Sequence, residues 1–86
     1  MVVAFSGCEV LGVEDFVSKK GTRCGVLRWF DRTEHQVYRT MLFGDDVNTI
    51  SGLRRGDVAH LLFEVSASRA DDSIRLVLTQ AEPEDA

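Results

Sequence analysis

Apolar and polar residues alternate along most of the chain, which is the period-2 pattern of half-buried β-strands. The alternation predicts strands at Val3–Val17, Thr22–Asp31, Gln36–Phe43 and Asp57–Ser66, and a last strand with Ile74, Leu76 and Leu78 on its inner face. Gly7 and Gly12 interrupt the first strand, and a glycine inside a strand marks a bulge or a bend. We therefore expect one long and bent first strand.

One segment has helical spacing instead. Between the third and fourth strands, Val47, Ile50 and Leu53 recur at intervals of three residues. The preceding pair Asp45-Asp46 suits a helix N-cap, and the following Arg54-Arg55 suits the negative end of a helix dipole. We expect a short helix of barely three turns here.

Three strands, a short helix and two strands make the element order of the OB-fold, a partly open five-stranded barrel. The sequence thus predicts an all-β protein with a small helical contribution, built as a five-stranded OB-fold-like barrel with a short helix between strands 3 and 4. A small five-stranded barrel in which residues 45–55 form only a loop is the alternative.

The length of 86 residues allows one small domain. Its last six residues, AEPEDA, carry three acids and no base. We interpret residues 1–80 as a single barrel domain and residues 81–86 as an acidic, flexible C-terminal tail. The formal net charge is −4, but without the tail ten bases face eleven acids, which leaves room for a local basic face.

The N-terminus has no basic leader and no apolar run of signal-peptide length, and no segment approaches the roughly 18 apolar residues of a membrane helix. This predicts a cytoplasmic protein without a membrane partner. Cys8 and Cys24 are too few and too far apart for a zinc knuckle or a redox C-x-x-C motif. We expect both to be buried free thiols.

An enzyme is not expected. His35 and His60 have no Ser or Cys partner at a spacing typical of a catalytic nucleophile. The pairs Asp45-Asp46 and Asp71-Asp72 lie in predicted turns, where Asp is favoured for local hydrogen bonds, so we predict no metal site. The chain also lacks a phosphate-binding glycine loop, and we predict no cofactor.

Cations and aromatic residues gather in the second and third strands and in the turn before them. The predicted nucleic-acid-binding residues are Lys19, Lys20, Arg23, Arg28, Trp29, Tyr38 and Arg39. A protein that binds single strands needs cations for phosphates and ring faces for bases, and each stacked base contributes about 1–3 kcal/mol. We expect Trp29 and Tyr38 to stack on bases while the five cations follow the phosphates.

The second strand has no purely apolar face. Cys24 and Arg28 lie on one face, and Leu27 and Trp29 lie on the other. A bulge near Gly25 would let Cys24 and Leu27 point inward together, and Trp29 is then either a core or a surface residue. Four phenylalanines, Phe5, Phe30, Phe43 and Phe63, are expected in the core, as is Phe16 beside the hairpin.

The stretch GLRRGDV, from Gly52 to Val58, resembles the passage that leads from helix to strand in bacterial OB-fold proteins. The length, the basic hairpin before an aromatic strand and the final strand are similar to those of the small single-stranded DNA-binding proteins of phages and mobile elements. The resemblance spans residues 5–80 in architecture. It implies sequence-tolerant binding of single-stranded DNA, with RNA as a related ligand.

A homodimer is expected as well, because so small a barrel covers few nucleotides and gains affinity when two sites are joined. Val58, Leu62 and Val77 are the apolar residues predicted on the outside of the last two strands. The net acidity favours a second hypothesis, in which the barrel is a non-enzymatic protein-interaction or assembly subunit.

Overall fold

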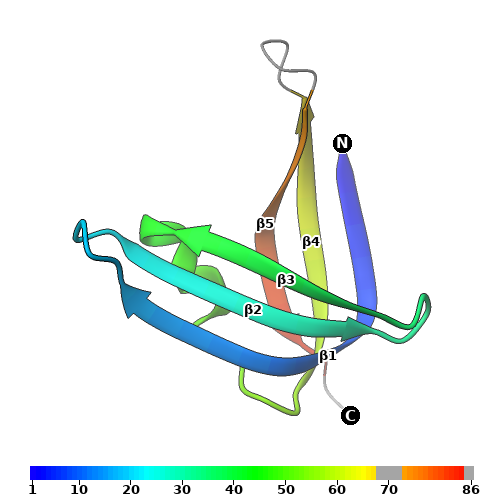
Figure 1. Ribbon diagram of the computed structural model, residues 1–86. Helices are drawn as coiled ribbons and strands as arrows, with labels where there is room; N and C mark the ends of the chain where they lie inside the picture. The colour runs from blue at the N-terminus through cyan, green and yellow to red at the C-terminus, as the bar shows by residue number, and fades with distance from the viewer. Residues whose placement is uncertain (68–72, 85–86) are drawn as a thin grey trace.

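The computed structural model describes residues 1–67 and 73–84, and strands make up most of them (Figure 1). The elements are β1 (Val2–Val17), β2 (Arg23–Asp31), β3 (Gln36–Phe43), the 3-10 helix η1 (Gly44–Ile50), β4 (Val58–Ala67) and β5 (Ile74–Pro83). The strands form one antiparallel sheet in the order β3-β2-β1-β4-β5. The predicted fold class is confirmed, whereas the Asp71-Asp72 pair of a predicted turn lies outside the described residues.

β1 belongs to both halves of the sheet because it bends. Its first part pairs with β4 and its second part pairs with β2 (Figure 1). The pairing register shifts between Phe5 and Cys8 and again between Val10 and Gly12, which confirms the bulges predicted at the two glycines. Gly7 has φ +67°, a conformation that favours glycine. The β4–β5 hairpin consequently stands at a steep angle to β2 and β3.

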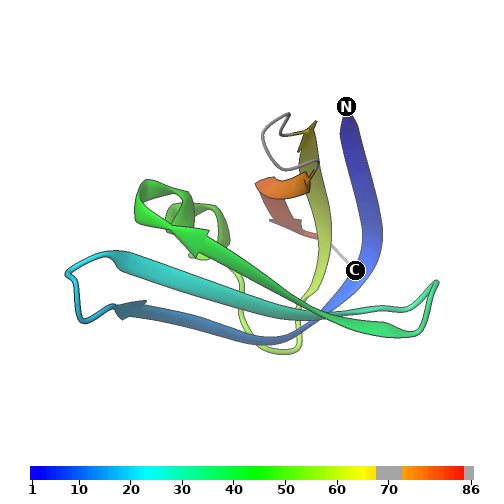
Figure 2. The ribbon, with the colours of Figure 1, turned by 45° about the horizontal axis from the view of Figure 1, so that its top comes forward.

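The sheet curls into an open, OB-like barrel. β3 and β5 are its two edges, and no ladder joins them within the described residues. The views in Figures 1 and 2 agree that the two strands face each other across the open side. The expected barrel is therefore present without closure, which is compatible with the partly open OB-fold.

The core lies on the inner side of this curl, and η1 covers one end of it. Val47 and Ile50 of η1 are buried, and so is Leu53 just after it. η1 is a 3-10 helix with Phe43 at its N-cap position and no side-chain cap, so the expected Asp cap is wrong. Gly25 of β2 lies beneath η1, where a Cβ atom would be only 2.9 Å from Val47 Cγ1.

The C-terminal residues belong partly to the sheet. β5 extends to Pro83, and the partly buried Ala81 packs against the core. The Glu84 backbone N–H donates to the Val58 carbonyl oxygen at 2.7 Å, and its Oε1 accepts from the Gly7 N–H at 3.0 Å. The tail predicted from residue 81 is therefore wrong for residues 81–84, because they complete the pairing of β5 beside β4 and the bend of β1.

Both cysteines are free and buried, as predicted. In the described parts of the chain, no helix has the length and apolar character needed to span a membrane.

Candidate nucleic-acid interface

The register of β2 with its two neighbours resolves which face of this strand is inside. Gly25, Leu27 and Trp29 face the core, while Val26 and Arg28 point to the outer side, because residues directly opposite in a ladder share a face. Both ladders run through Gly25 without a shift, so the bulge expected there is wrong. The irregularities lie in β1 instead.

Trp29 belongs to the core. It is 2% exposed, and its Nε1–H donates to Thr40 Oγ1 at 3.0 Å. Tyr38 stacks on it with ring centroids 4.7 Å apart, and Phe5 and Phe63 pack at 5.3 and 5.9 Å. Trp29 therefore presents no free ring face to a base, and the expectation that it stacks on nucleic acid is corrected. Tyr38, at 39% exposure, is the accessible member of this aromatic cluster.

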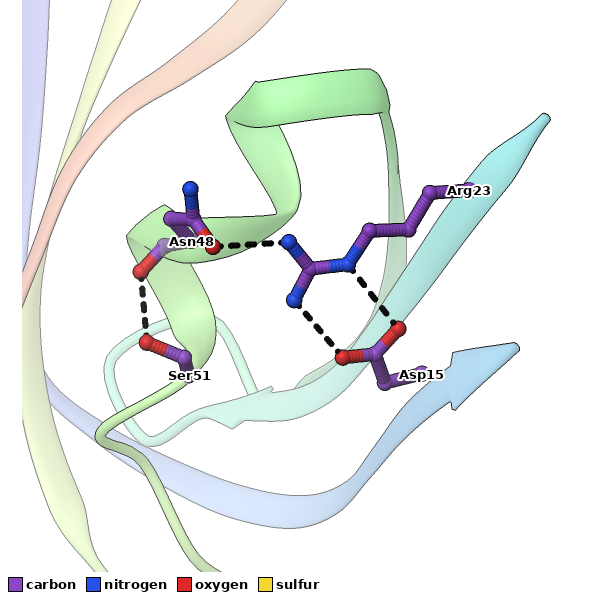
Figure 3. A network of polar contacts seen from close by, with 4 residues as sticks. All are labelled: Asp15, Arg23, Asn48 and Ser51. Carbon is purple, nitrogen blue, oxygen red and sulfur yellow. Dashed lines mark hydrogen bonds and ion pairs between the residues drawn. The ribbon is translucent and has the colours of Figure 1, made fainter. Parts of the chain in front are cut away.

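Arg23 is held by neighbouring side chains (Figure 3). Its Nε and Nη2 donate to the two carboxylate oxygens of Asp15 at 3.3 and 2.9 Å, and its Nη1 donates to Asn48 Oδ1 at 2.7 Å. The hydrogen bonds from Arg23 hold the pKa of Asp15 below its usual value. Arg23 thus links the β1–β2 hairpin to η1, and three of its five N–H donors are used within the protein.

Arg28 and Arg39 remain open to a ligand. They lie directly opposite each other on β2 and β3, and both are exposed. Neither forms an ion pair with any residue in the described ranges. A Cβ atom on Gly12 would be 2.8 Å from Arg28 Nη2, which shows that the guanidinium of Arg28 lies across the bare backbone of β1. Arg55, interpreted above as a helix-dipole cation, lines the same surface hollow as Arg28.

Exposed apolar side chains continue this surface along the strands. Phe16 and Phe43 lie on either side of Cys24, and Met41 lies beside Val26, all on the outer side. Phe16 is 43% and Phe43 is 54% exposed, so the expectation of core positions is wrong for these two rings. We name Phe16, Arg28, Arg39, Met41 and Phe43 together the outer face.

The sequence contained a signal for two of these residues. Met41 and Phe43 share the alternation parity of Arg39, so they had to lie on the same side of β3 as that cation. At the far end of the hairpin, Lys19 and Lys20 are exposed in the turn, as predicted. Their turn directly follows β1, which ends one residue after Phe16.

Acidic residues also reach the outer face. Glu14 is paired with Val26, and Glu9 lines the hollow that contains Arg28 and Arg55. The surface is therefore mixed in charge, with its cations concentrated at Arg28, Arg39 and Arg55. Among the described residues, no group of His, Cys, Asp and Glu is arranged to hold a metal ion.

Comparisons with protein-family models, with curated proteins and with solved structures gave no match.

Proposed function

We propose that this protein binds single-stranded DNA through the outer face, without strong sequence preference. The observation that carries the proposal is the pairing of Arg28 directly opposite Arg39, with no carboxylate of the described residues bound to either. Like charges directly opposite on neighbouring strands destabilise a sheet. The guanidinium of Arg28 lies over β1, away from β3, so each arginine would contact its own phosphate, and these contacts would offset the repulsion.

The aromatic residues of the outer face suit the bases of such a ligand. Phe16 and Phe43 expose ring surface, and unpaired bases stack on aromatic rings with little regard to their identity. A strand advances about 3.3 Å per residue, so the four residues from Arg39 to Phe43 separate cation and ring by roughly 13 Å. The ligand would therefore follow the direction of β3, from the arginines towards the hairpin and its two lysines.

The acidic charge of the whole chain sets the expected strength. With a net charge of −4 and with Glu9 and Glu14 beside the cations, long-range attraction of nucleic acid is weak. Binding would then depend on short-range contacts to phosphate and on stacking. We expect RNA to bind similarly, because neither phosphate contacts nor stacking distinguishes the two sugars.

The test is a titration of labelled oligo(dT) at low and moderate salt. Replacing both Arg28 and Arg39 by Ala should weaken binding by at least about tenfold. It should also reduce the slope of log affinity against log salt by roughly 1.4, which is about 0.7 for each lost phosphate contact. Arg32→Ala, at an exposed position in the β2–β3 turn, is the matched control and should change little. No binding by the unaltered protein at low salt, or equal affinity of the double variant, would refute the proposal.

A protein-interaction role is the second candidate, and one observation favours it. Large apolar side chains are exposed along both edges of the sheet, including Val37 and Met41 on β3 and Ile74 and Leu76 on β5. Contiguous exposed apolar surface commonly marks a protein interface.

A further inference from the structure

The open side of the barrel contains an apolar cleft that overlaps the outer face only at Arg39, Met41 and Phe43. It consists of two adjoining hollows that share Met41 and Leu76. We name it the seam cleft, and its apolar lining includes Tyr38, Met41, Phe43, Leu76, Phe5 and Phe63.

Both walls of the seam cleft are sheet edges. Within residues 1–67 and 73–84, β3 and β5 each pair with one neighbour only. Alternate backbone N–H and C=O groups of each strand therefore point towards the seam without a strand partner among these residues. Natural proteins usually protect such edges with lysine, proline or several charges. Here β3 and residues 74–78 of β5 contain only Arg39 and Arg75 as charged residues and no proline. These edges are available for pairing.

The side chains beside the two edges are apolar and accessible. Leu76 is 56% and Met41 is 46% exposed, and Phe5 and Phe63 lie behind them with ring centroids 5.6 Å apart. A strand added at either edge would direct every second side chain towards these rings. The occupant should therefore have an extended backbone and apolar residues at alternate positions.

The charged residues around the seam cleft indicate which side chains the occupant should carry between its apolar residues. Arg39 and Arg75 line the seam cleft together with one acid, Asp46, which gives a net positive rim. Within the described residues none of these three is in an ion pair. Charge complementarity therefore favours acidic side chains on the occupant.

We propose that the seam cleft binds an extended acidic segment of a partner protein by β-strand addition. The added strand would pair with the free edge of β3 or β5, place its apolar residues against Phe5 and Phe63, and place its acids near Arg39 and Arg75. A peptide fits better than a nucleic acid because the edges offer repeated amide donors and acceptors, which only another peptide backbone matches in register.

The probe for this proposal is a labelled ten-residue peptide of alternating valine and glutamate, capped at both ends. We expect it to bind in fluorescence anisotropy, and the same peptide with lysine in place of glutamate to bind at least tenfold more weakly. A third peptide, with every second amide N-methylated, should not bind, because N-methylation removes the donors needed for strand pairing. Equal binding of all three peptides, or no binding of the acidic peptide at millimolar concentration, overturns the proposal.

Variants of the protein test whether the peptide binds in the seam cleft. Leu76→Asn changes an exposed residue of the seam cleft and should reduce peptide affinity by at least tenfold, whereas Val37→Asn, an exposed β3 residue outside the cleft lining, should leave it unchanged. Arg28→Ala should weaken oligo(dT) binding without affecting the peptide, so failure of either proposal is seen separately. If the acidic peptide does not bind and Leu76→Asn instead dissociates a dimer in sedimentation, the occupant is a second copy and the proposal is overturned.

Discussion

At the scale of single residues, Gly25 fixes how closely η1 approaches the sheet. Its missing side chain leaves room for Val47 and Ile50, and an added Cβ would lie 2.9 and 3.2 Å from their methyl carbons. Both neighbours are buried, so they have little freedom to move away. We expect Gly25→Ala to lower the free energy of unfolding by about 1–3 kcal/mol, the usual cost of overpacking a core. Gly52→Ala is the control, since no atom lies within 4 Å of its added Cβ. Equal urea midpoints for the two variants would contradict this account of the contact.

A second single residue, Cys8, makes the stability of the fold depend on pH through its thiol proton. Burial raises the pKa of its thiol from 9.0 to about 11, and the nearby carboxylates of Asp31 and Glu84 act in the same direction. Between these two values the unfolded chain has lost the proton that the folded protein still binds. The associated stability is thus fully present below about pH 9 and is lost as the pH approaches 11, by at most about 1.4 kcal/mol per pH unit.

Urea unfolding at several pH values between about 8 and 10 tests this effect. The unaltered protein should lose stability more steeply over that range than Cys8→Ala, which has no thiol at this position. All other residues are common to both proteins, so their contributions cancel in the comparison. Parallel pH profiles would show that the thiol does not contribute.

At the scale of elements, the Arg23 bridge holds η1 against the β1–β2 hairpin. One guanidinium group bonds both Asp15 and Asn48, as Figure 3 shows. Arg23→Met should keep the aliphatic length, remove both contacts, and increase amide hydrogen exchange in η1, while oligo(dT) affinity stays the same. A large loss of DNA affinity with unchanged exchange would restore the role in phosphate binding that the sequence predicted for Arg23.

The same bridge has a pH dependence of known sign. Because the pKa of Asp15 is lowered in the folded state, its contribution is present above the carboxyl's usual pKa and is lost as the pH falls through the lowered value. Faster exchange in η1 should therefore appear in the unaltered protein under strongly acidic conditions. Arg23→Met should not show this additional acid-dependent change.

The elements themselves were largely predictable, whereas the faces of two strands were not. Alternation located all five strands and the glycines located the bends of β1, because both signals act within one segment of chain. The inner face of β2 was ambiguous because Gly25 fills a core position without an apolar side chain. η1 supplies the missing apolar volume there, and that packing joins segments about 25 residues apart.

The candidate site was predictable only in part for a related reason. Arg28, Arg39, Lys19 and Lys20 are accessible, as the pattern of cations indicated. The aromatic residues were assigned by their general tendency to be buried. The sequence analysis listed Trp29 in the candidate site and Phe43 in the core, and the structure reverses the two. Trp29 fills the core while Phe43 is half exposed on an edge strand, where no further strand covers it.

At the scale of the whole molecule, the barrel offers two surfaces that overlap along β3. The outer face carries the arginine pair and exposed rings, and the seam cleft opens between the two sheet edges. Arg39, Met41 and Phe43 belong to both surfaces, and Arg39 is the charged residue among them. A ligand on one surface should therefore compete with a ligand on the other for these three residues.

Assembly is the remaining whole-molecule question, and we expect a homodimer. A single small barrel covers few nucleotides, and joining two DNA sites raises affinity without new contacts. Of the three apolar residues predicted on the outside of the last two strands, Val77 is exposed, while Val58 and Leu62 are half-buried and offer less surface.

Sedimentation at micromolar concentration should show a dimer, and Val77→Lys should shift it towards monomer because a buried lysine without a partner is costly. Val2→Lys, exposed near the start of β1, is the control and should leave the dimer intact. A monomer for the unaltered protein, both alone and with oligo(dT), would mean that each barrel binds its ligand by itself.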